Sequence, residues 1–218
     1  MERLPDWIRA ELIPYPQSGA LGYADLLARV RAAVADMSSF YVLGASFGGP
    51  LAIQLADAEP DKVKGLILCA SFVRAPMRNL ARVRFAIVGP LVWLLRLARR
   101  LPVWTVRRRD DPMRIAKAET WSRVPASALA ARARAVLAAD VHDQLGNCTL
   151  PMLAIEYSED AVVRTHHVDE LCDAHRSAQR LLLRGGHLGM HSDPVPLAAA
   201  VSRFIEGIES GSIKPAHS

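Results

Sequence analysis

The sequence has few cysteines, no long apolar run and no export signal. Its three cysteines, Cys69, Cys148 and Cys172, form no CxxC pair, which argues against a disulfide scaffold or a zinc knuckle and favours a reducing compartment. The longest apolar stretch, Phe85 to Leu95, has eleven residues and contains Gly89-Pro90, whereas a transmembrane helix needs about 20. The first fifteen residues carry acidic side chains and lack the basic-then-apolar pattern of a signal peptide. These absences predict a cytoplasmic protein.

The composition excludes disordered and collagen-like chains. The 218 residues are 51% hydrophobic and 22% charged, and glycine and proline occur at ordinary levels. This length and apolar content are sufficient for one packed core. The sequence therefore predicts a single domain over residues 1–218.

Acidic residues are absent from residues 62–109, which hold twelve lysines and arginines. The net charge of +5 belongs to this segment, because the rest of the chain is net acidic. Its arginines are interleaved with apolar side chains such as Trp93, which suits an amphipathic or lid-like helix and predicts no nucleic-acid partner. A solvated helix flank is the plain interpretation, and weak contact of this basic segment with an anionic membrane surface is the alternative.

Short apolar runs alternate with helical periodicities on both sides of a long Arg-, Ala- and Leu-rich segment. Strands are predicted at Trp7–Pro14, Phe40–Leu43, Val63–Cys69, Leu150–Glu156 and Arg180–Leu183. Helices are predicted at Tyr23–Asp36, Leu51–Ala58, Val168–Ala174 and Pro196–Ile208. This order predicts a mostly parallel α/β sheet with a helical insertion at about residues 72–143.

Gly44-Ala45-Ser46-Phe47-Gly48 forms the pattern G-x-S-x-G between a predicted strand and a predicted helix. A serine at so sharp a turn is strained, and the glycines at 44 and 48 avoid collisions that Cβ atoms would cause. The turn lifts Ser46 Oγ above the carboxyl edge of the sheet, and the N–H of Phe47 is expected to point at an oxyanion formed there. The pattern predicts a nucleophilic serine, and a plain Gly-rich turn that begins a helix is the alternative.

A nucleophilic hydroxyl needs a base on another loop at the same edge. His187 is the best candidate, because it follows a predicted strand through Gly185-Gly186 on a flexible loop. The histidines at 142, 166, 167, 175 and 217 fit less well, since they lie at helix ends or in polar or terminal sequence. His187 and His191 have the spacing of metal ligands on one helix face, but without an intervening Glu or a third ligand no metal is predicted.

The base needs a carboxylate that holds its other nitrogen. Asp160 suits this role because it follows the predicted strand Leu150–Glu156 and gives the chain order Ser, Asp, His. Glu159 is the immediate alternative, and Asp140 and Asp143 are more distant ones.

Gly44 to Gly49, Asp160 and His187 together resemble the nucleophile elbow, acid and base of the α/β-hydrolase superfamily, in particular small bacterial carboxylesterase-like members. The resemblance covers most of the chain, with residues 72–143 similar to the family's cap. It implies hydrolysis of carboxylic esters of small or medium apolar acyl groups, with a small-molecule ester as substrate and no cofactor. By this resemblance Ser46 attacks the carbonyl, His187 transfers the proton, Asp160 orients His187, and Trp93 in the cap contributes to the acyl pocket.

The amino-terminal part departs from the superfamily pattern. There, a strand and a loop that supplies a second oxyanion N–H precede the segment resembled by Trp7–Pro14, whereas Met1 falls almost at this segment. We therefore expect an amino-terminally truncated sheet without that loop. Loss of one oxyanion donor commonly lowers turnover by about 10² to 10³. The alternative function is accordingly a weak or inactive binding protein of the same fold, and the sequence does not indicate the oligomeric state.

Overall fold

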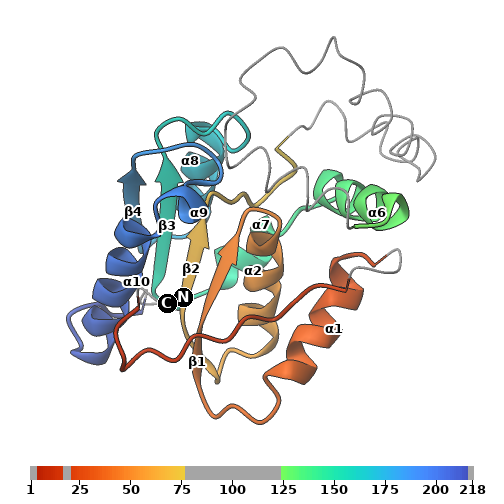
Figure 1. Ribbon diagram of the computed structural model, residues 1–218. Helices are drawn as coiled ribbons and strands as arrows, with labels where there is room; N and C mark the ends of the chain where they lie inside the picture. Colours follow the sequence, from red (N-terminus) through yellow and green to blue (C-terminus); the bar gives the residue numbers. More distant parts are fainter. Residues whose placement is uncertain (1–3, 17–20, 77–123, 216–218) are drawn as a thin grey trace. The chain divides into compact units, whose positions relative to one another are not determined.

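The computed structural model describes residues 4–16, 21–76 and 124–215 (Figure 1). The chain divides into two compact units. One consists of residues 1–13, 27–76 and 139–218 and contains the sheet. The other consists of residues 14–26 and 77–138 and includes α6 (Ala126–Leu137). Helix α1 (Tyr23–Ala33) has residues in both units.

Four parallel strands form the sheet, in the order β1-β2-β3-β4. Their bounds are Phe40–Ala45, Val63–Cys69, Met152–Tyr157 and Ala178–Leu183. Since all four run in the same direction, their carboxyl ends meet at one edge (Figure 1). The predicted parallel α/β fold is confirmed, with each of these strands within a few residues of its predicted position.

Helices cover both faces of this sheet. On one face α2 (Gly48–Ala58) packs on β1 and β2, and α8 (Thr165–Ala174) packs on β3 and β4. Helix α7 (His142–Asn147) contacts both of these helices. On the opposite face lies α10 (Pro194–Glu209), which follows the short α9 (Gly189–Ser192) (Figure 1). This two-sided cover explains why the central strands β2 and β3 are largely apolar, whereas the edge strand β4 contains Gln179 and Arg180 and is only partly buried.

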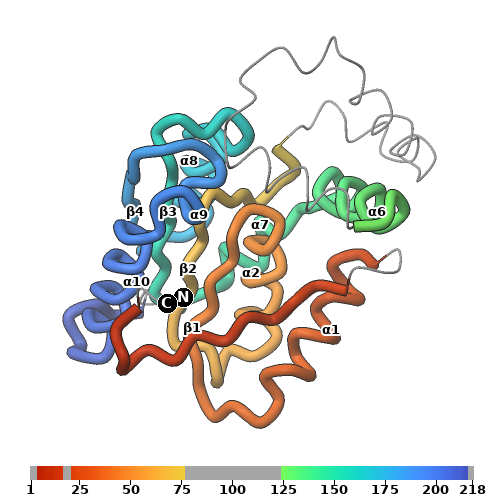
Figure 2. Tube along the Cα trace, in the orientation of Figure 1, coloured from red at the N-terminus to blue at the C-terminus, as the bar shows by residue number. Residues whose placement is uncertain are grey.

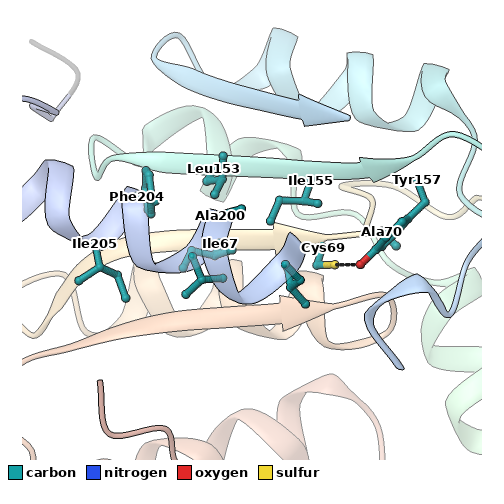
Figure 3. Packing of buried hydrophobic residues seen from close by; sticks show 11 residues of the cluster. Ile67, Cys69, Ala70, Leu153, Ile155, Tyr157, Ala200, Phe204 and Ile205 are labelled. Carbon is teal, nitrogen blue, oxygen red and sulfur yellow. Dashed lines mark hydrogen bonds between the residues drawn. The ribbon is translucent and has the colours of Figure 1, made fainter. Parts of the chain in front are cut away.

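The core under α10 is built from alternate residues of β2 and β3. Ile67, Leu153 and Ile155 point from the strands toward Phe204 and Ile205 of the helix (Figure 3). Because side chains alternate along a strand, the neighbouring residues Leu66 and Met152 face the other side of the sheet, where they are also fully buried. Burial of each such side chain contributes about 1.5–3 kcal/mol to the stability of the fold. The close packing of this core keeps the strand ends at the carboxyl edge rigid.

The predicted strand at Trp7–Pro14 is wrong. Residues 4–16 form no strand, and Figure 2 shows them in red as irregular chain. Trp7 and Leu12 are 53% and 73% exposed, and of the apolar side chains in this segment Ile8 and Ile13 are only partly buried. Pro14 has no N–H to donate to a neighbouring strand, which also opposes pairing there.

The predicted insertion at about residues 72–143 lies largely outside the described residues, which exclude 77–123 and therefore Trp93. Near its two ends, residues 73–75 and 139–141 run antiparallel. Ala75 N–H donates to the carbonyl of Ala139, and Val141 N–H donates to that of Val73, both at 3.0 Å. Within the described ranges no helix combines the length and the apolar character needed to cross a bilayer.

Candidate active site

Ser46 occupies the turn between β1 and α2, as its sequence pattern predicts. Its φ of 49° lies in the left-handed region, which a residue other than glycine adopts at a cost of about 1–3 kcal/mol. Hydrogen bonds hold this conformation: Ser46 N–H donates to the carbonyl of Cys69 at 2.9 Å, and Gly49 N–H donates to the carbonyl of Ser46 at 3.0 Å. The strained conformation of Ser46 is thus held by hydrogen bonds to the neighbouring strand and to the first turn of α2.

Gly44 allows α2 to approach β1 closely behind this turn. A Cβ at residue 44 would lie 2.7 Å from Ala52 Cβ and 2.8 Å from Gly49 Cα, closer than such atoms approach in proteins. The structure therefore agrees with the expectation that any side chain larger than that of glycine would collide at residue 44.

His187 reaches Ser46 from the loop that follows β4. Its Nε2 lies 2.9 Å from Ser46 Oγ, and its Nδ1 lies 2.8 Å from Asp160 Oδ2. The structure thus brings together three side chains that stand far apart in the sequence, at the carboxyl edge where β1, β3 and β4 end.

The carboxylate of Asp160 is held by the turn that contains it. Asp160 Oδ1 accepts the backbone N–H groups of Val162 at 2.8 Å and Val163 at 2.9 Å. Its side chain is 1% exposed, whereas that of His187 is 17% exposed. With Oδ1 bound to two donors, Oδ2 is left to face His187.

This arrangement defines the proton positions that the site can use. An N–H at Nδ1 of His187 donates to the Asp160 carboxylate, which leaves the lone pair of Nε2 to accept the hydroxyl proton of Ser46. The site therefore provides a hydroxyl, a base in contact with it, and an acid that orients the base.

Backbone hydrogen bonds join the loop of the acid to the loop of the base. Ser158 N–H donates to the carbonyl of Leu183 at 2.9 Å, and Glu159 N–H donates to that of Gly185 at 2.8 Å. The structure places Asp160 against His187, whereas the side chain of Glu159, the alternative acid, is exposed. These bonds extend the β3–β4 pairing into the site.

The more distant acids and several of the other histidines have contacts elsewhere. Asp140 pairs with Arg74 at 3.3 Å, and Asp143 pairs with His142 at 3.4 Å. His167 accepts the N–H of Arg164 at Nδ1, and its Nε2 lies 3.2 Å from the carbonyl of Pro76. His175 is buried and His191 is exposed. Across the described ranges, no group of three or more His, Cys, Asp or Glu is arranged to hold a metal ion.

Phe47, the expected oxyanion donor, immediately precedes α2. Trp93, the expected acyl-pocket residue, falls outside the described residues. The sequence interpretation missed Val162 and Val163, whose N–H groups fix Asp160. Asp side chains commonly accept N–H groups two or three residues further along the chain, but almost every residue carries an N–H, so the sequence held no specific signal for these two.

Solved structures share this fold. A hydrolase from Pseudomonas aeruginosa PA01 is 20% identical with a TM-score of 0.69, covering 86% of this chain and 73% of its own. A crystal structure described with carboxylesterases of the thaumarchaeon Nitrososphaera gargenis is 17% identical with a TM-score of 0.70. The match covers 89% of this chain and 75% of the other. An esterase from Exiguobacterium antarcticum is 13% identical with a TM-score of 0.69, covering 88% and 76%. None of the curated proteins matches the sequence.

The sequence also matches a family model, described as serine aminopeptidase, S33, over residues 22–187. This range begins before α1 and ends at His187, so it includes the strand-turn-helix around Ser46 and the turn of Asp160. Because the match extends over more than half of the chain, the protein belongs to the serine aminopeptidase S33 family of the α/β-hydrolase superfamily.

Proposed function

We propose that this protein is a serine hydrolase that cleaves carboxylic esters of small or medium apolar acyl groups. The observation that carries the proposal is the continuous contact from Ser46 Oγ through His187 to Asp160, at 2.9 and 2.8 Å. The esterases among the structural relatives support an ester as the substrate. Family membership supports hydrolysis more generally.

In the first half of the reaction, Ser46 Oγ attacks the carbonyl carbon of the ester while His187 Nε2 takes the hydroxyl proton. The imidazolium so formed is stabilised by Asp160, which accepts the N–H at Nδ1. Negative charge develops on the carbonyl oxygen, and we assign its stabilisation to the N–H of Phe47. Collapse of this intermediate expels the alcohol, which takes the proton from His187 and leaves an acyl group on Ser46.

In the second half, water attacks the acyl carbonyl. His187 Nε2 now accepts a proton from the water, and collapse of the second intermediate returns that proton to Ser46 Oγ as the acid departs. No cofactor enters this sequence. The same geometry serves an amide substrate, whose leaving amine would take the proton from His187 in place of the alcohol.

The test is acylation and turnover by the purified full chain. We expect hydrolysis of p-nitrophenyl acetate and butyrate with a burst of p-nitrophenol, and labelling of Ser46 by a fluorophosphonate. Ser46→Ala should abolish both. An aminoacyl p-nitroanilide, tested in parallel, separates ester from peptide hydrolysis.

A folded wild type that shows neither burst nor labelling would overturn this function. That result would favour the alternative derived from the sequence, a binding protein of the same fold with an unreactive serine. Circular dichroism and thermal unfolding establish that the inactive sample is folded.

A further inference from the structure

Ser71 lies behind the peptide group that joins Ser46 to Phe47. It follows the end of β2, it is 1% exposed, and its hydroxyl donates to the carbonyl oxygen of Ser46 at 3.2 Å. Gly49 N–H donates to the same oxygen at 3.0 Å. The carbonyl of the candidate nucleophile therefore accepts two hydrogen bonds, one of them from a buried side chain of the neighbouring strand end.

These two hydrogen bonds fix the orientation of the whole peptide group between Ser46 and Phe47. A trans peptide group is planar, and its C=O and N–H point in opposite directions. The described residues contain no cis peptide bond, so holding the carbonyl of Ser46 also sets the direction of the N–H of Phe47. The same constraint restricts ψ of Ser46, the rotation about its Cα–C bond. The other backbone angle of this residue, φ, is 49° and lies in the left-handed region.

Gly49 and Ala70 both contribute to the position of Ser71, Gly49 by leaving space for its side chain and Ala70 by its backbone conformation. A Cβ at residue 49 would overlap Ser71 Oγ and lie 2.5 Å from Ser71 Cβ, so Gly49 leaves the space that this side chain occupies. On the other side, Ala70 has a φ of 47° and donates its N–H to the carbonyl of Ile155 at 2.8 Å. A residue other than glycine keeps such a conformation only where its surroundings hold it. Two strained turns, at Ser46 and at Ala70, thus meet through Ser71.

We infer that Ser71 is a positioning residue for the hydrolysis proposed above, and this inference rests on that proposed function. The Ser71 hydroxyl holds the peptide between Ser46 and Phe47 so that Ser46 Oγ stays within reach of His187 while the N–H of Phe47 keeps its direction toward the oxyanion. Ser71 acts through this peptide and touches no reacting atom. Ser71 should stabilise the transition state more than the bound substrate, because negative charge on the carbonyl oxygen of the substrate develops only in the transition state.

The experiment compares Ser71→Ala with wild type on p-nitrophenyl butyrate. We expect kcat to fall about 3- to 10-fold, the equivalent of one neutral hydrogen bond, with KM unchanged. Affinity for an alkylboronic acid, which forms a tetrahedral adduct on Ser46, should fall by the same factor as kcat/KM. Ser71→Thr, which keeps the hydroxyl, should restore kcat to within about twofold of wild type.

Ser202→Ala is the matched control. Ser202 is also buried, and its hydroxyl donates to the carbonyl of Ala198 at 2.9 Å within α10. The Ser202→Ala variant should remain folded and keep its kcat, because it loses a buried hydroxyl hydrogen bond far from the candidate active site while alanine suits the helix. If Ser71→Thr does not fold, the boronate affinity of Ser71→Ala relative to Ser202→Ala decides the question.

The failures of the two proposals are distinguishable. An active wild type together with a Ser71→Ala variant of full kcat and full boronate affinity would overturn the role of Ser71 alone. Equal losses in Ser71→Ala and Ser202→Ala would overturn it as well, since they would reflect general destabilisation. A wild type without burst or labelling would overturn the hydrolase function and the role of Ser71 with it.

Discussion

Gly189 lies against the ring of Tyr157 so closely that a Cβ at residue 189 would overlap the ring atoms. Gly189 begins α9, two residues after His187, and Tyr157 ends β3, three residues before Asp160. The contact therefore joins the segment that carries the candidate base to the strand that carries the candidate acid. Tyr157 is itself part of the core under α10 (Figure 3).

Gly189→Ala should displace the loop of His187. A shift of about 1 Å in a catalytic group lowers turnover on the order of 100-fold, so we expect kcat for p-nitrophenyl butyrate to fall about 10- to 100-fold. Overpacking at this contact should also lower the free energy of unfolding by about 1–3 kcal/mol. Steady-state kinetics and urea unfolding measure the two effects.

Gly146→Ala is the control for this change. A Cβ at residue 146 would have 3.8 Å to its nearest neighbour, the carbonyl oxygen of Ala174, so the added methyl group should be tolerated with full kcat. Tyr157→Leu in the Gly189→Ala background should recover part of the lost activity by making room. Wild-type kcat in Gly189→Ala would contradict the assigned contact.

Asp160→Asn should nearly abolish turnover, with a fall in kcat of about 10⁴. If the amide oxygen of the substituted side chain keeps the N–H groups of Val162 and Val163, its NH₂ must face His187 Nδ1 and favour the tautomer with the proton on Nε2. Flipping the amide would instead place NH₂ against two backbone N–H donors. Single-turnover acylation measures the loss.

Glu159→Gln provides the comparison, because this exposed neighbour contributes only its backbone N–H to the loop contact with Gly185. Its kcat should stay within about twofold of wild type. An equal loss in both variants, or a loss confined to Glu159→Gln, would mean that the wrong acid has been assigned.

The buried His175 should make stability fall in acid. His175 is 1% exposed, and burial lowers its pKa from the ordinary value of 6.5. The unfolded chain therefore binds a proton more readily than the folded one, so stability present above pH of about 6.5 is lost as the pH falls. One linked proton changes the free energy of unfolding by at most about 1.4 kcal/mol per pH unit.

Urea unfolding between pH 5 and 7 tests this linkage in His175→Phe, which keeps a flat ring without a titratable group. The variant should lose less stability than wild type as the pH falls. His191→Gln, which removes an exposed imidazole, is the control. Parallel curves for wild type and His175→Phe would show that His175 is not responsible.

Cys69 should resist alkylation in the native protein. Burial raises the pKa of the Cys69 thiol to about 11, and its sulfur lies 4.0 Å from the hydroxyl of Tyr157 (Figure 3). At pH 8 only about one thiol in a thousand is then in the reactive thiolate form. Iodoacetamide labelling followed by peptide mass spectrometry should find Cys69 unmodified in native protein and modified in guanidinium. Rapid native labelling would contradict the burial of this thiol.

Several elements of the fold were predictable because their causes are local. The run Val63–Cys69 forms β2 over those same residues and is buried on both faces except at Lys64. The glycines around Ser46 identify the turn, since a close approach of helix to strand leaves no space for a side chain at residue 44. The strand expected at Trp7–Pro14 failed because an apolar pattern does not supply the neighbouring strand with which it must pair.

The sequence by itself determined the parallel α/β arrangement and the strained serine, since apolar periodicity and the steric demands of a sharp turn act over a few residues. Only the tertiary structure decided between Asp160 and Glu159, because adjacent side chains in a turn point in different directions. It alone also placed Ser71 behind Ser46 and Tyr157 beneath Gly189. These contacts join segments on different strands and loops, and their geometry depends on how the strand ends align at the edge of the folded sheet.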